Sequence, residues 1–318
     1  MPTLLLNRSA LKDLLKMPDI IRAVEDAFKA WGQDKANMPP KAYLVVEQGD
    51  FRAMPAAIPG AVGMKWVNVH LNNISRDLPT VMAVLIYSDP ETGYPLAVMD
   101  ATDITAYRTG ATSAIASKYL ARHNSHTLGI IGAGRQAYTQ ILAHAELFDL
   151  MLIKVFDRSS VAMERLINSL PDYPLKQCSL EDTATSDIIC TLTPSRIPVL
   201  KKDSIIPGTH INAIGADAEG KEELEPSILK EATVVVDDLK QASAAGEINV
   251  PVSRGLFTVD EVYATLSEIL LGKKQGRVDK DVITIFDSTG VAIEDVATAK
   301  LIYEKAKQVG SYTSIDLV

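Results

Sequence analysis

The chain has 318 residues, of which 47% are hydrophobic and 23% charged, and its formal net charge at pH 7 is −8. The length favours two domains over a single hydrophobic core, and the composition is ordinary for a globular protein. No run is rich in lysine and arginine and no apolar run approaches the length of a membrane span, which argues against nucleic acid and membrane partners.

The first 120 residues predict strands that do not alternate with helices, which is typical of a mixed sheet. A helix is expected over 18–31, where apolar residues recur at helical spacing after Pro18. A second helix is expected over 105–121. The strands are expected at 41–47, 51–54, 63–70, 80–88 and 94–99.

From residue 127 onward, apolar strands alternate with stretches of helical length, which is typical of a parallel sheet covered on both faces. We therefore predict an α/β protein with a Rossmann-type doubly wound parallel sheet and a mixed α+β domain. The Rossmann-type domain is expected over 121–290, and the mixed α+β domain over 1–120 with a C-terminal helix over about 291–318. The strands are expected at 127–131, 151–157, 187–192, 209–214, 232–237 and 282–287.

The most informative motif is Gly132-Ala-Gly134-Arg-Gln-Ala137, between an expected strand and an expected helix. Gly132 permits a tight turn, Gly134 lets the backbone approach a pyrophosphate, and Ala137 lets the helix pack closely on the strand. Asp157 ends the next strand, where a carboxylate that binds ribose is expected. The alternative is a glycine turn that binds nothing, with Asp157 as an ordinary acid at a strand end.

Other candidate residues follow predicted strands, at the edge where open α/β sheets bind ligands. Four cations, Lys41, Arg52, Lys65 and Arg108, lie within or beside apolar segments. Buried cations are costly unless paired, so several facing one cleft would bind a carboxylate substrate; singly, each also fits a solvated face or a structural pair. The strand-end candidates are Thr191, Thr193, Gly215, Asp217 and Ser288.

The spacing of cysteines and histidines predicts no metal site. Cys178 and Cys190 lack the spacing of metal ligands, and the five histidines are scattered. The chain also shows no signal pattern at its N-terminus. We therefore expect reduced thiols in a soluble cytoplasmic protein.

With these motifs in view, the chain resembles the ornithine cyclodeaminase/mu-crystallin family over nearly its full length, and within it the archaeal alanine dehydrogenase branch. The resemblance implies a homodimer formed by sheet pairing of the first domain. The motifs that carry it are Arg52-Ala-Met-Pro55, Gly63-Met-Lys65, Leu78-Pro-Thr80, Thr105-Ala-Tyr-Arg108-Thr-Gly-Ala-Thr-Ser-Ala, the Gly132–Ala137 motif, Gly215-Ala-Asp217 and Asp287-Ser-Thr-Gly-Val-Ala-Ile-Glu-Asp295.

The resemblance also implies roles for individual residues. Asp217 matches the carboxylate that handles protons at the substrate amine and the attacking water, with Lys65 as a second catalytic residue. The substrate carboxylate would be held by Lys41, Lys65 and Arg108, with Arg52 beside them and with Thr80 and Val291 at the pocket. The cofactor would be held by Thr109, Gly132, Ala133, Gly134, Arg135, Gln136, Asp157, Arg158, Ser159, Thr191, Thr193, Ile214, Gly215 and Ser288.

The activity that the resemblance implies is NAD-dependent oxidative deamination of a small L-amino acid, alanine first. Ornithine cyclodeaminase or a cyclic ketimine reductase is the alternative, and a mu-crystallin-like nucleotide-binding protein with little catalysis is a second. The position of Arg52 is acidic in the cyclodeaminase branch, and arginine there would repel the terminal ammonium of ornithine. Asp157 favours NAD, although Arg158 and Ser159 leave NADP possible.

Overall fold

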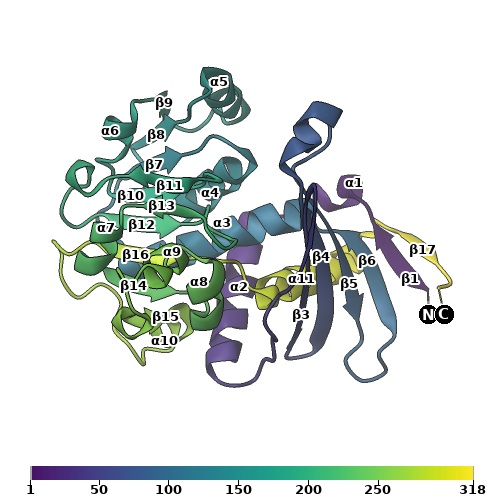
Figure 1. Cartoon of the computed structure of the whole chain (residues 1–318). Helices are drawn as coiled ribbons and strands as arrows, with labels where there is room; N and C mark the ends of the chain where they lie inside the picture. The colour runs from purple at the N-terminus through teal and green to yellow at the C-terminus, as the bar shows by residue number, and fades with distance from the viewer. Residues whose placement is uncertain (1, 318) are drawn as a thin grey trace. The chain divides into compact units, whose positions relative to one another are not determined.

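The computed structural model describes residues 2–317, except for the side chain of residue 74. The chain forms two compact units, one of residues up to 108 with those from 291, and one of residues 109–290 (Figure 1). The first division falls within helix α3 (Thr102–Leu120), whereas the sequence placed it at residue 120. The reason is close packing within the second unit. A Cβ atom on Gly110 would lie 2.5 Å from the carbonyl oxygen of Thr139, on helix α4 (Arg135–Ala145).

The first unit contains a seven-stranded mixed sheet in the order β17-β1-β6-β5-β4-β3-β2. Neighbouring strands are antiparallel except β1 and β6, which are parallel. The predicted mixed sheet is therefore confirmed, with two further strands at one end of it, β1 and the edge strand β17, that the sequence pattern did not indicate. The strands are β1 (Thr3–Leu6), β2 (Ala42–Val46), β3 (Gly49–Ile58), β4 (Ala61–Val69), β5 (Val81–Ser88), β6 (Pro95–Asp100) and β17 (Thr313–Ile315).

Helix α11 (Ala292–Val309) covers one face of this sheet, and helix α2 (Met17–Gly32) packs against α11. Alternate residues of β4 are buried toward that face, among them Lys65 and Val67, while Trp66 between them is exposed. Because side chains of a strand alternate between faces, the sheet has one covered face and one outer face. The outer face is also apolar, with Trp66, Val84 and Ile86 exposed on it.

The second unit contains an eight-stranded sheet in the order β15-β14-β16-β12-β10-β7-β8-β9, with all pairs parallel. The strand order reverses between β7 and β10, which is the point where doubly wound sheets bind ligands. The predicted Rossmann-type sheet is confirmed. The strands are β7 (Thr127–Ile131), β8 (Leu152–Phe156), β9 (Leu175–Gln177), β10 (Ile188–Thr191), β12 (His210–Ala213), β14 (Thr233–Val236), β15 (Ala264–Thr265) and β16 (Thr284–Asp287).

Both faces of this sheet are buried in apolar cores. Leu128 and Ile130 of β7 lie in one core with Ile141 of α4, whereas Ile131 and Ile189 lie in another. Consecutive apolar residues on a strand therefore serve opposite faces, as in a parallel sheet with helices on both sides.

The remaining elements are α1 (Arg8–Leu11), α5 (Ser160–Ser169), α6 (Leu180–Thr183), α7 (Pro226–Glu231), α8 (Leu239–Ala245), α9 (Asn249–Ser253), α10 (Leu266–Leu270), the 3₁₀ turns η1 (Leu71–Arg76), η2 (Lys202–Ser204) and η3 (Val259–Glu261), and a small parallel pair, β11 (Arg196–Leu200) with β13 (Glu222–Leu224).

A chain of buried polar side chains crosses the core of the second unit. His144 Nδ1 lies 2.8 Å from the carbonyl oxygen of Gln140 and therefore carries a proton, which leaves Nε2 to accept from Ser117 Oγ at 2.9 Å. Burial lowers the pKa of His144 to about 4 and that of His210 to about 3, so both imidazoles are neutral at pH 7. The hydrogen bonds run through Thr284, His210, Asn212, Ser117 and His144.

Among the helices over residues 2–317, none has the length and apolar character needed to cross a membrane.

Candidate functional site

Four charged side chains form a buried cluster in the first unit. Lys65 Nζ lies 2.8 Å from Asp295 Oδ2, and Arg108 Nη1 lies 2.6 Å from Glu294 Oε2. Arg108 Nε is 3.0 Å from Asp295 Oδ1, so Asp295 joins the two cations. All four residues are at most 5% exposed. The cluster is formally neutral, which is how a protein tolerates charges out of water.

The pKa of Lys65 is lowered by its place in this cluster. Burial, followed by the charge of Arg108, lowers the pKa of Lys65 to about 7, while Asp295 and Glu294 oppose the shift. Lys65 therefore gains and loses its proton near neutral pH. A buried lysine with such a pKa is a candidate for proton chemistry as well as for binding.

Arg52 lies on the same covered face of the sheet. The strand register pairs Met54 with Lys65 and Arg52 with Val67, so Arg52 and Lys65 are diagonal neighbours on β3 and β4. Arg52 Nε donates to Asp50 Oδ1 at 2.7 Å, and its guanidinium lies over the ring of Tyr43. The structure thus brings three of the four expected cations, Lys65, Arg108 and Arg52, to one region of the first unit.

The other expected substrate residues of this unit lie near element ends. Lys41 directly precedes β2, and Thr80 directly precedes β5, with its carbonyl oxygen accepting from the N–H of His70 at 2.8 Å. Val291 precedes α11 and is buried, and its N–H donates to Glu294 Oε1 at 3.1 Å. Glu294 therefore caps α11 with one oxygen and binds Arg108 with the other.

In the second unit, the glycine motif has the geometry of an anion site. Gly132 has φ +105°, a conformation that favours glycine, and follows β7. Gly134 is the N-cap of α4, and a Cβ atom built on it would meet nothing within 4 Å. The start of α4 thus combines an open backbone surface with the positive end of a helix dipole, which suits a phosphate.

Asp157 closes this loop. Its Oδ2 accepts from Ala133 N at 2.7 Å and its Oδ1 accepts from Ser159 N at 2.8 Å. The carboxylate joins the turn after β7 to the turn after β8, at the position expected for ribose. Ser159 in turn caps α5 through Ala162 N, and Arg158 between them is exposed. Of the other expected cofactor residues here, Arg135 is exposed, Gln136 is half-buried and Thr109, on α3, is buried.

The turns after β10 and β12 are joined by an acid that the sequence did not single out. Glu223 Oε1 accepts from Thr193 N at 2.6 Å and from Thr193 Oγ1 at 2.7 Å, and Glu223 Oε2 accepts from Gly215 N at 2.8 Å. Ile214 and Gly215 both donate backbone hydrogen bonds to the carbonyl oxygen of Thr191. Three of the expected strand-end residues, Thr191, Thr193 and Gly215, therefore meet within the second unit.

Asp217 follows this turn. Its Oδ1 lies 2.5 Å from Lys221 Nζ, and its side chain is 31% exposed. At the end of β16, a different acid organises the chain: Asp237 Oδ2 accepts from Thr289 N at 2.6 Å and from Gly290 N at 2.8 Å, and lies 3.4 Å from Ser288 Oγ.

The residues that sequence reasoning missed are acids. Glu294 and Asp295 end the last motif of the family resemblance without an assigned role, and Glu223 lies in none of the motifs. One signal was available: buried cations need partners, and two acids in succession near the start of the expected helix at 291 were suitable candidates. No comparable signal marked Glu223, because its partners are backbone N–H groups.

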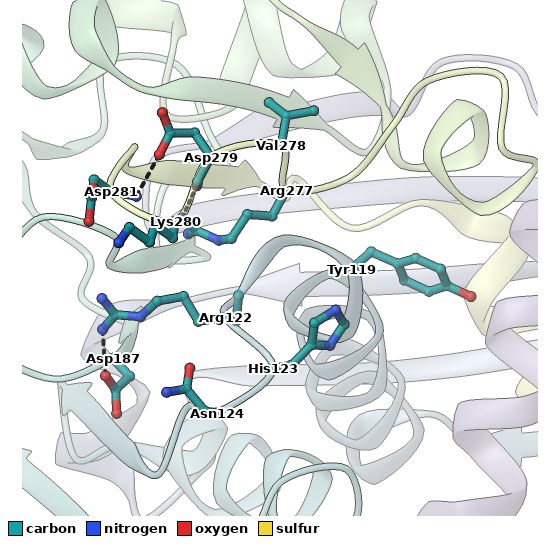
Figure 2. A pocket seen from close by; sticks show the side chains of 11 residues that line it. Tyr119, Arg122, His123, Asn124, Asp187, Arg277, Val278, Asp279, Lys280 and Asp281 are labelled. Carbon is teal, nitrogen blue, oxygen red and sulfur yellow. Dashed lines mark hydrogen bonds and ion pairs between the residues drawn. The ribbon is translucent and has the colours of Figure 1, made fainter.

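A cavity of about 620 Å³ lies elsewhere in the second unit (Figure 2). Its lining includes residues that precede β7, β10 and β16, so it lies at the amino ends of the strands, away from the glycine motif. Arg122 there binds Asp187, and Arg277 donates to several backbone carbonyl groups. These arginines serve the packing of the fold, and the cavity is not the expected site.

Comparison with known proteins gives consistent results. A sequence model of the ornithine cyclodeaminase/mu-crystallin family matches residues 1–310. The alanine dehydrogenase of Archaeoglobus fulgidus is 50% identical over 315 residues, which cover 98% of each chain. A solved archaeal alanine dehydrogenase dimer with bound NAD covers 100% of both chains at 48% identity, with a TM-score of 0.98. The Δ¹-pyrroline-2-carboxylate reductase of Thermococcus litoralis, solved with NADH and L-proline, has a TM-score of 0.95 at 37% identity and covers 98% of this chain and 100% of its own.

The buried cluster makes a testable prediction about Lys65. Asp295→Asn removes the carboxylate that raises the pKa of Lys65, so the pKa should fall below about 7. Carbon-13 NMR titration of labelled lysine side chains measures this directly. Asp50→Asn is the control: it removes the charge of the carboxylate that binds Arg52 and should leave the pKa of Lys65 unchanged. A Lys65 midpoint near 10.5 in the unmodified protein contradicts the assignment.

Proposed function

The chain belongs to the ornithine cyclodeaminase/mu-crystallin family, and we propose that it is an NAD-dependent alanine dehydrogenase. The reaction is the reversible oxidative deamination of a small L-amino acid, alanine to pyruvate and ammonia. The observation that carries the choice of substrate is the buried arginine at position 52. A guanidinium there attracts a carboxylate and repels a second ammonium group, which disfavours ornithine.

The glycine motif supports NAD as the cofactor. NAD held there would supply a hydride acceptor for the substrate Cα. The open backbone at Gly134 and the start of α4 suit the pyrophosphate, and Asp157 suits a ribose diol because its carboxylate repels a 2′-phosphate. NADP remains a second option through Arg158 and Ser159. The further residues that would hold the cofactor are Thr109, Ala133, Arg135, Gln136, Thr191, Thr193, Ile214, Gly215 and Ser288.

In the proposed mechanism, the cations of the first unit bind and orient the substrate carboxylate. Lys41, Lys65 and Arg108 hold it, with Arg52 beside them, and Thr80 and Val291 border the bound molecule. Fixing the carboxylate restricts the orientation of Cα, and orientation of this kind supplies a large part of an enzymatic rate. Lys65 also exchanges a proton near pH 7, so it assists proton transfer in the same reaction.

Asp217 is the proposed general base. The substrate amine must lose a proton before hydride departure, and water must lose one as it adds to the resulting imine carbon. A carboxylate with an exposed fraction of 31%, held by Lys221, is accessible enough to exchange these protons. No metal ion is needed for either step.

A reductase acting on a cyclic imine is the second candidate, because the Thermococcus litoralis relative was solved with NADH and L-proline. An ornithine cyclodeaminase is disfavoured by Arg52. A nucleotide-binding protein with little catalysis is disfavoured by the buried cations, which such a protein would not need. We also place the protein in the cytoplasm, where its two free cysteines would stay reduced.

The outer face of the first sheet supports a homodimer. Trp66 pairs with Val84, and Met64 pairs with Ile86, so these apolar residues are neighbours on one face. An apolar face of this kind is typical of an interface, and one solved relative is a dimer. The large hydrophobic residues exposed on it are Leu44, Val46, Trp66, Val84 and Ile86.

The proposed function predicts that the purified protein with L-alanine and NAD accumulates NADH, and that NAD is used better than NADP. Absorbance of the reduced cofactor measures this. L-ornithine is the control, since a cyclodeaminase forms proline from it with no net NADH. Formation of proline from ornithine, with no NADH from alanine, refutes the proposal.

Asp217→Asn should lower kcat at least about 1,000-fold, because the amide cannot accept the amine proton. Binding of NADH, followed by its fluorescence, should change little. Lys221→Met is the matched control: it removes the partner of Asp217 but keeps the base. Near-normal turnover by Asp217→Asn would contradict the role of Asp217 as the general base.

Trp66→Glu should convert the dimer to a monomer, because it places a charge in the centre of the apolar outer face. Sedimentation velocity measures the mass in solution. Met151→Glu alters an exposed apolar residue of the second unit and should leave the mass unchanged. A monomeric unmodified protein contradicts the dimer.

A further inference from the structure

Glu223 occupies a central place in the second unit, although the proposed reaction gives it no role. It lies on β13 with its side chain fully buried, and among the described residues no lysine or arginine forms a salt bridge with it. Its carboxylate is instead compensated by N–H and O–H donors of Thr193 and Gly215. Burying a carboxylate that has no cationic partner lowers the stability of the folded chain. The presence of Glu223 at this position therefore indicates a specific structural role.

The two oxygens of Glu223 serve two different turns. Oε1 binds the turn after β10 through Thr193, and Oε2 binds the turn after β12 through Gly215. The strands β10 and β12 are neighbours in the sheet. A Cβ atom on Gly215 would lie 2.5 Å from Glu223 Oε2 and 2.1 Å from Thr193 O, so only glycine permits this approach.

Glu223 also closes the loop that contains Asp217. The loop leaves the eight-stranded sheet after β12 and leads into β13, which pairs with β11, so the hydrogen bond that Gly215 N donates to Glu223 joins its two ends. The middle of the loop is held by Asn249, whose side chain bonds Gly220 N at 2.9 Å and Lys221 O at 2.8 Å. Asp217 is therefore carried by a loop fixed at its ends and at one internal point.

A second acid holds Glu223 in place. Glu247 Oε1 accepts from Glu223 N at 2.8 Å and from Leu224 N at 2.7 Å, and the N–H of Glu247 donates to Asp287 Oδ1 at 2.9 Å. Each acid in this series accepts from the backbone of the one before it. The series extends from the end of β16 to the turns after β10 and β12.

We propose that Glu223 is a positioning residue, which sets the loop of Asp217 against the Thr193 turn through the two oxygens of one carboxylate. The proposal rests on the proposed function, in which Asp217 moves protons and Thr193 and Gly215 border the cofactor. A carboxamide cannot replace the carboxylate. One of its two ends is an NH₂ group, which would face either Thr193 N–H or Gly215 N–H, donor against donor.

Glu247 provides the matched comparison for Glu223, because the geometry predicts that replacement by glutamine is tolerated at Glu247 and not at Glu223. Both of its amide partners donate to Oε1, at 2.8 and 2.7 Å, and only Glu223 N is shared with Oε2, at 3.0 Å. Burial and the neighbouring Glu223 raise the pKa of Glu247 well above its ordinary value. A carboxamide whose oxygen takes the place of Oε1 keeps the closer acceptor for both amides.

The experiment compares Glu223→Gln with Glu247→Gln in the full-length protein. For Glu223→Gln, kcat for alanine oxidation should fall about 10- to 100-fold, as expected for a displaced catalytic group, while KM for alanine changes less than threefold. Glu247→Gln should keep kcat within threefold. Glu223→Asp, which keeps two oxygens on a shorter side chain, should recover part of the loss and serves in its place if Glu223→Gln does not fold.

Hydrogen exchange of the peptide over residues 210–219 is the second readout and does not require turnover. Exchange should be at least tenfold faster in Glu223→Gln and unchanged in Glu247→Gln. Equal kcat and equal exchange for Glu223→Gln and the unmodified protein overturn the proposal, as does an equal loss in both variants. If the unmodified protein does not oxidise alanine, the proposed function fails, and the exchange comparison still decides the role of Glu223.

Discussion

The structure depends on buried carboxylates whose charge is balanced by cations or by hydrogen-bond donors instead of by water. In the first unit, Asp295 and Glu294 neutralise Lys65 and Arg108, and in the second unit Glu223 binds backbone N–H groups. A buried charge is costly unless it is paired or hydrogen-bonded, so each of these acids fixes the position of what it binds. In the first unit the acids fix the positions of cations, and in the second unit Glu223 fixes the positions of two turns.

This arrangement has a consequence for the carboxylate substrate that we propose to bind in the first unit. The cluster of Lys65, Arg108, Glu294 and Asp295 is already neutral, so a further negative charge needs a further proton or cation nearby. Lys65 has a pKa of about 7, and a carboxylate beside it would raise that pKa. Ligand binding and proton uptake by Lys65 are therefore linked, and Arg52 supplies charge that does not titrate.

The sequence predicted those parts of the fold that have a strong period. The helix over 18–31 and the strand over 127–131 have clear apolar patterns, and both form with little change in their bounds. Strands β9, β13 and β15 have two or three residues, too few for any period to appear. The site divides in the same way: the glycine motif and the cations stand out locally, whereas Glu223 is recognised only once the fold brings Thr193 and Gly215 beside it.

The two buried imidazoles of the second unit set a limit on acid tolerance. His144 and His210 bind protons with pKa values of about 4 and about 3 in the folded chain, against 6.5 when exposed. The unfolded chain therefore takes up protons first as the pH falls below about 6.5, and the free energy of unfolding decreases through that range.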